Sequence, residues 1–113
     1  MDSLQTVVEL PEFQKRAKAI MPDTERHEAV DYIAANPESG IPLGGGLRKI
    51  RIPREGSGKS GGFRTIDVFG GRHMPIFLIT VFGKNEKGNL TKPEQTAAVA
   101  LSKKIIAAYG EMK

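Results

Sequence analysis

The chain has 113 residues, of which 39% are hydrophobic and 27% charged, and it carries a net charge of +4. This size suits one hydrophobic core, so we expect a single domain over residues 1–113 and exclude a two-domain enzyme with a separate cofactor module. The absence of cysteine excludes disulfides, thiolate nucleophiles and cysteine-based zinc sites. No stretch matches a secretory signal or a membrane span of about 18 apolar residues, so we expect a cytoplasmic protein without a membrane partner.

The positive charge is concentrated in the middle of the chain. Residues 1–43 carry a net charge of −4, residues 44–92 one of +7, and residues 93–113 one of +1. A concentrated positive field attracts polyanions such as nucleic acid. The middle of the chain is therefore the expected location of a binding site.

The N-terminal third predicts a strand followed by two helices. A β-type run over residues 4–9 predicts the strand. Apolar residues then recur at spacings of four and three between Pro11 and Ile20, which predicts a short helix. Asp23 is expected to cap a second helix that closes at Asn36-Pro37. Together the two helices form a helical hairpin.

The next part is rich in glycine and predicts strands. Residues 40–71 hold 10 of the chain's 13 glycines, which disfavours helix there. Three β-type runs follow one another, over residues 47–52, 63–69 and 75–82, and the glycine-containing connections between them predict consecutive antiparallel hairpins. The third run is apolar on both faces, so we expect it to be covered on both sides.

The C-terminal part predicts one more helix. Thr91-Lys92-Pro93-Glu94 has the S/T-x-x-E form of a capping box, and Gly110 is expected to end the helix. The predicted element order is β-α-α-β-β-β-α. It defines an α+β domain in which an antiparallel sheet carries the helices on one face.

Cations on two of the predicted strands are the first candidates for chemistry. The two-residue period of a strand places Lys49 and Arg51 on one face and Arg48 on the other. These residues are consistent with either a solvated sheet face or a ligand-binding face. Arg64 ends an otherwise apolar row formed with Ile66 and Val68, where a cation is costly to bury unless it is paired or faces a ligand.

The glycine-rich loop contains two misleading motifs. Residues 56–61 match G-x-G-x-x-G and include Gly-Lys-Ser, but Pro53 occupies the position of the first P-loop glycine, and the loop leads into a strand where a dinucleotide-binding motif requires a helix. We therefore expect no nucleotide cofactor. Lys59 and the surrounding backbone amides could still approach a phosphate, and an ordinary hairpin tip explains the loop equally well.

Other catalytic constellations are missing from the sequence. The two histidines have no metal-ligand spacing, and no serine, histidine and carboxylate set suggests a hydrolase. Catalysis by cations is coherent for RNA, because RNA supplies its own 2′-hydroxyl nucleophile and cleavage needs positioning and stabilisation of the phosphate. Phe82, at the end of the third run, is a candidate for stacking on a splayed base.

Four sequence blocks follow one another in the chain: NPESG at 36–40, GLRKIR at 46–51, GKSGGFR at 58–64 and FGKNE at 82–86. In this order they resemble the RelE/HigB-type toxins of bacterial type II toxin-antitoxin modules, and the match spans nearly the whole chain, from Val8 to Tyr109. The resemblance implies a compact microbial RNase-like fold. It also implies an mRNA endonuclease that acts on the translating ribosome, needs no metal or other cofactor, and is neutralised by a cognate antitoxin that often binds DNA.

The resemblance also implies roles for particular residues. Arg64 would stabilise charge on the scissile phosphate, Lys59 and Lys84 would clamp phosphate or assist proton transfer, and Lys49, Arg51 and Arg48 would grip the RNA. Related toxins commonly carry a tyrosine in the strand after the Gly-Gly-x-Arg block. This chain has Ile66-Asp67-Val68-Phe69 there, so the general base has no assignment.

Two other functions stay open at the level of sequence. A toxin of the related ParE type acts on DNA gyrase without cleavage, although that group generally lacks the Lys/Arg set. A non-catalytic nucleic-acid-binding module would use the same basic sheet and would bind with a steep dependence on salt.

Overall fold

The computed structural model describes residues 4–53, 62–83 and 89–111, and it confirms an α+β fold. The elements in chain order are β1 (Val7–Glu9), α1 (Pro11–Ile20), α2 (Asp23–Ala35), β2 (Ile41–Gly44), β3 (Leu47–Ile52), β4 (Phe63–Val68), β5 (Ile76–Gly83) and α3 (Lys92–Glu111). All predicted elements are present, and β2 is additional. This short strand contains a proline and lies at the sheet edge, where proline is tolerated, so its sequence carries little strand signal.

The five strands form one mixed sheet in the order β1-β5-β4-β3-β2. Strands β3, β4 and β5 pair as antiparallel neighbours, as predicted, and the additional strand β2 pairs antiparallel with β3. Strand β1 pairs with β5 in parallel, so the expectation of a purely antiparallel sheet was wrong. The α1–α2 hairpin carries the chain away from β1, which leaves that strand without a hairpin partner and free to pair with a strand distant in the sequence.

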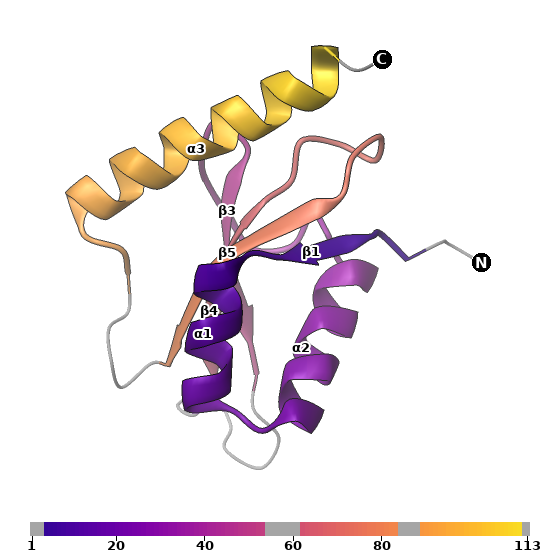
Figure 1. Cartoon of the computed structure of the whole chain (residues 1–113), viewed down its shortest axis with the longest axis vertical. Helices are drawn as coiled ribbons and strands as arrows, with labels where there is room; N and C mark the ends of the chain where they lie inside the picture. The colour runs from indigo at the N-terminus through magenta and orange to yellow at the C-terminus, as the bar shows by residue number, and fades with distance from the viewer. Residues whose placement is uncertain (1–3, 54–61, 84–88, 112–113) are drawn as a thin grey trace.

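The sheet is covered by helices on both faces, which corrects the prediction that all helices lie on one face. In Figure 1, α3 lies on one side of the sheet, and α1 and α2 lie on the other. Strand β5 supplies both cores: Leu78 and Val81 pack in the α1–α2 cluster, whereas Phe77 and Phe82 belong to the α3 cluster. The prediction that this strand is covered on both sides is confirmed.

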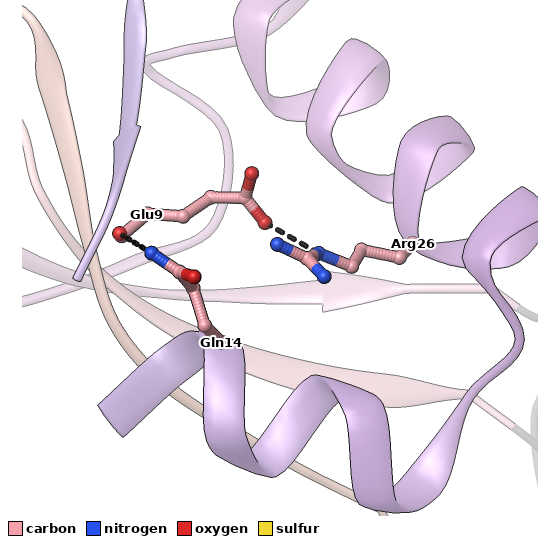
Figure 2. Close-up of polar contacts among 3 residues, drawn as sticks. All are labelled: Glu9, Gln14 and Arg26. Atoms are coloured by element: carbon pink, nitrogen blue, oxygen red, sulfur yellow. Dashed lines mark hydrogen bonds and ion pairs between the residues drawn. The ribbon is translucent and has the colours of Figure 1, made fainter. Parts of the chain in front are cut away.

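Polar contacts join β1 to the α1–α2 hairpin (Figure 2). The Nε atom of Arg26, in α2, donates to Oε1 of Glu9 at 2.7 Å, and both side chains are largely buried. The Nε2 atom of Gln14, in α1, donates to the backbone carbonyl of the same glutamate at 2.8 Å. Helix α2 starts at Asp23, with Pro22 at the N-cap position, so the prediction of Asp23 as the cap was one residue off.

Helix α3 begins at the predicted capping box. The Thr91 amide donates to Oε1 of Glu94 at 2.8 Å, and the Glu94 amide donates to Oγ1 of Thr91 at 3.3 Å. The helix continues through Gly110 to Glu111, so the prediction that Gly110 ends it was wrong. Within the described ranges no helix, α3 included, is both long and apolar enough to cross a membrane.

The turn between β2 and β3 anchors α3 to the sheet. The buried Ser102 hydroxyl, in α3, donates to the carbonyl of Gly45 at 2.7 Å. Gly46 has a φ of +88°, and a Cβ atom there would lie 2.2 Å from Cδ1 of Ile106. The turn therefore requires glycine both for its backbone conformation and for the close approach of the helix.

Candidate nucleic-acid interface

Three cations from β3 and β4 lie on the sheet face that α3 covers in part. In the antiparallel register Lys49 is opposite Ile66, and Arg51 is opposite Arg64. Ile66 packs in the α3 cluster, and side chains of opposed residues share a face. We call Lys49, Arg51 and Arg64 the cation row. The alternation of side chains predicted which face of its own strand each cation occupies. The register between β3 and β4 shows that the cations of the two strands share one face of the sheet.

The electrostatics of the cation row suit an anion. Arg51 and Arg64 are directly opposed, and like charges in such a pair repel, so an anion bound beside both side chains would be favoured there. The Arg64 side chain is partly buried, and its Nη1 atom is buried without a hydrogen-bond partner. Such an unsatisfied donor is costly, and an anionic oxygen would satisfy it with a charge-assisted hydrogen bond.

Lys49, in the cation row, has a hydrogen-bond partner that sequence reasoning missed. The Nζ atom of Lys49 donates to Oδ1 of Asn89, which lies 40 residues later in the chain, between β5 and α3. Asn89 stands in a polar connection and matches no motif. Only the three-dimensional path of the chain reveals the contact.

Arg48 is not brought together with the cation row. Its guanidinium donates to three backbone carbonyls between α2 and β2: Ser39 at 3.0 Å, Glu38 at 2.7 Å and Gly40 at 3.2 Å. Alternation along β3 places this side chain on the α1–α2 face, opposite Lys49 and Arg51. The structure thus gives Arg48 a role in holding a turn on the face opposite the cation row, which separates it from the RNA contact predicted for it.

Phe82 is buried where the sequence predicted a base-stacking side chain. The residue lies opposite Arg64 on β5, so it is next to the cation row, but its side chain is only 1% exposed and packs in the α3 cluster. A ring placed in this way offers no open face to a base. The apolar character of β5, which suggested a stacking platform, reflects core packing.

Two predicted catalytic residues, Lys59 and Lys84, lie outside the described residues. The strands that flank them can be placed: β3 ends at Ile52, β4 starts at Phe63 and β5 ends at Gly83, all at the end of the sheet where Arg51 and Arg64 lie. Within the described ranges, no group of three histidine or acidic side chains is arranged to hold a metal ion.

A groove borders the cation row on its β5 side. It has a volume of about 630 Å³ and runs between α1 and the first half of α3. Ile66 and Phe82, the neighbours of the cation row in the sheet, form part of its floor. Its other lining residues are mostly apolar, with Glu12, Arg16 and Glu94 at its margins.

Asp67 is the one acidic residue buried among the described strands, and it lies on the face opposite Arg64. Its side chain is 1% exposed, and its Oδ1 atom has no hydrogen-bond partner. Burial raises the pKa of this carboxyl to about 7, against the smaller opposing effects of the Thr65 hydroxyl and the positive charge of Arg48. Its position across the sheet separates it from any phosphate held by the cation row.

The sequence matches the family described as the RelE toxin of the RelE / RelB toxin-antitoxin system over residues 7–112. The chain therefore belongs to the RelE toxin family, as the resemblance of the four sequence blocks predicted. It is the toxin of a toxin-antitoxin module, and its family implies a cognate antitoxin as partner. The mixed sheet with three helices is consistent with the RelE fold.

Proposed function

We propose that this toxin is a metal-independent endoribonuclease that cleaves mRNA, with the translating ribosome as its setting, and thereby inhibits translation. The observation that carries the proposal is the cation row, with the buried and unpartnered Nη1 atom of Arg64 at one end. This arrangement places guanidinium and ammonium groups on one face, as binding to a phosphodiester backbone requires.

The proposed chemistry uses the nucleophile that RNA supplies. The 2′-hydroxyl attacks the adjacent phosphorus, the bond to the 5′-oxygen of the next nucleotide breaks, and the products are a 2′,3′-cyclic phosphate and a 5′-hydroxyl. Negative charge accumulates on the non-bridging oxygens during this step, and Arg64 would stabilise it with the charge-assisted hydrogen bond that its Nη1 atom lacks. Lys49 and Arg51 would hold the flanking backbone.

The reaction also requires a base to take the 2′-hydroxyl proton and an acid to give one to the leaving 5′-oxygen. Lys59 and Lys84 are proposed to clamp the phosphate or to assist proton transfer, as the family resemblance implies. Asp67 is not a candidate for the general base, because its carboxyl is buried on the opposite face of the sheet. The base is therefore left without an assignment.

The decisive test is to replace Arg64 and to map cleavage of transcripts. Wild type, Arg64→Ala and Arg64→Lys are induced briefly in cells, and RNA ends are mapped by primer extension. Loss of one preorganised donor to a transition-state oxyanion costs roughly 100- to 1,000-fold in rate, so Arg64→Ala should abolish detectable cleavage and relieve growth arrest. Arg64→Lys keeps the charge but loses the planar fork, and should fall between the two.

Arg72→Ala is the matched control. Arg72 is an exposed arginine in the β4–β5 connection, away from the cation row, so its loss should leave cleavage intact. A folded Arg64→Ala variant that still cleaves would contradict the proposed role of Arg64. Growth arrest with intact transcripts and blocked supercoiling would instead identify a gyrase inhibitor, and RNA binding without products would identify a non-catalytic module.

A further inference from the structure

Residues 89–91, which lead into α3, are held at three consecutive positions. Asn89 accepts a hydrogen bond from the Lys49 ammonium. Leu90 packs against the α3 cluster and lines the groove. Thr91 opens α3 through the capping box. Because the two residues that follow it are fixed, the amide side chain of Asn89 has a defined position from which to hold Lys49.

The chemical nature of this partner matters for the cation row. The lysine side chain is long and flexible, so it loses conformational entropy when its ammonium binds phosphate, unless the side chain is already oriented. An amide oxygen orients the ammonium without cancelling its charge, whereas a carboxylate would neutralise it. An ammonium has three N–H donors, so one hydrogen bond to Asn89 leaves two for other acceptors.

We propose that Asn89 is a positioning residue that presents the Lys49 ammonium to the RNA backbone. The inference rests on the proposed function, because it takes the cation row as the surface that binds RNA. It adds a residue outside the charged set, and it explains why the partner of Lys49 is neutral. Asn89 itself needs no contact with RNA.

The experiment separates orientation from charge. Binding of a fluorescent single-stranded 2′-O-methyl RNA, which cannot be cleaved at the modified positions, is measured by anisotropy at a series of salt concentrations. Each phosphate contact by a cation on a single strand contributes about 0.7 to the slope of log K against log salt. Asn89→Asp and Lys49→Ala should both flatten the slope by about that amount, and the double variant should flatten it no further.

Asn89→Ala removes the orienting group and keeps the charge. Its slope should match that of wild type, while its Kd rises about three- to tenfold, equivalent to roughly 1 kcal/mol. Asn89→Ser repeats this neutral truncation in case Asn89→Ala folds poorly. Lys18→Ala is the matched control, because Lys18 is an exposed lysine on α1 that does not line the groove beside the cation row, and its loss should change neither the slope nor the Kd.

The outcomes distinguish this inference from the proposed function. An unchanged slope in Asn89→Asp, or an unchanged Kd in both neutral variants, overturns the positioning role even if wild type cleaves mRNA. A flattened slope in Asn89→Asp, together with wild type that binds RNA but produces no cleavage, supports the positioning role and overturns the nuclease. Absence of RNA binding by wild type at every salt concentration overturns the inference.

Discussion

Replacing Asp67 by Asn should make the protein more stable at neutral pH, which is the reverse of the usual effect of removing a buried polar group. Burial raises the pKa of this carboxyl from its ordinary value of 3.8 to about 7. The folded state therefore holds a proton that the unfolded state has released, and folding becomes less favourable as pH rises from about 4 to about 7. Above that range the loss is complete.

The size of the effect follows from the two pKa values. At about 1.4 kcal/mol per pH unit, the difference corresponds to roughly 4 kcal/mol, which is an upper estimate because a buried site relaxes when it ionises. An asparagine has nearly the shape of the protonated acid and cannot ionise. The variant should match wild type near pH 4 and exceed it progressively up to pH 8, by as much as a few kcal/mol.

The assay is urea unfolding of both proteins at intervals from pH 4 to pH 8. Subtracting the two free-energy curves removes the contributions of the other titrating groups, which both proteins share. Asp31→Asn, an exposed carboxyl on α2, is the control and should give a difference near zero. The reasoning is refuted if the difference between Asp67→Asn and wild type does not change with pH, or if wild type gains stability relative to the variant as pH rises.

Two further substitutions test the assignments on the other elements. Arg48→Met should lower the free energy of unfolding, measured in urea, by about 1–3 kcal/mol, because it removes three hydrogen bonds to the turn carbonyls. It should leave the salt slope of RNA binding unchanged, and a flatter slope would show that Arg48 binds RNA. Gly46→Ala should cost about 2 kcal/mol or more, measured by thermal unfolding, because its positive φ and the close approach of Ile106 both exclude a Cβ atom. Gly110→Ala is the matched control: apart from the adjoining turns of its own helix, no atom of the described residues lies within 4 Å of its added Cβ. Helix propensity should therefore make it neutral or slightly stabilising, and an equal loss in both variants would contradict the steric argument.

Local patterns predicted most of the elements, because their signals lie within a few residues. Proline positions and apolar spacing located α1, and the capping box located the start of α3. The apolar character of β5 on both faces predicted that it is covered on both sides. The sequence nevertheless predicted that all helices lie on one face of the sheet, which was wrong. It also gave no indication that β1 pairs in parallel with β5, because strand partners distant in the sequence leave no local signal.

In the candidate site, too, features set within one strand were predictable from the sequence, and features that depend on contacts between distant segments were not. Alternation correctly placed Lys49 and Arg51 on one face of β3 and Arg64 on the apolar face of β4. The register that opposes Arg51 to Arg64, and the contact from Asn89 to Lys49, depend on pairing across the sheet. Burial of Phe82 also depends on α3, a helix that follows it in the chain, so its sequence suited a binding surface and a core equally well.

The alternation along β3 also has a consequence for how the protein can evolve. From Lys49 to Ile52, each residue of the cation row is followed by an isoleucine that packs in the α1–α2 core. Side chains on opposite faces of a strand contact separate sets of neighbours, so a substitution on one face leaves the packing contacts of the other face largely in place. Natural selection can therefore alter the charge pattern of the binding face one residue at a time while the neighbouring positions preserve the fold. Along β3, variation that alters recognition of the target and variation that alters stability therefore fall at different, alternating positions.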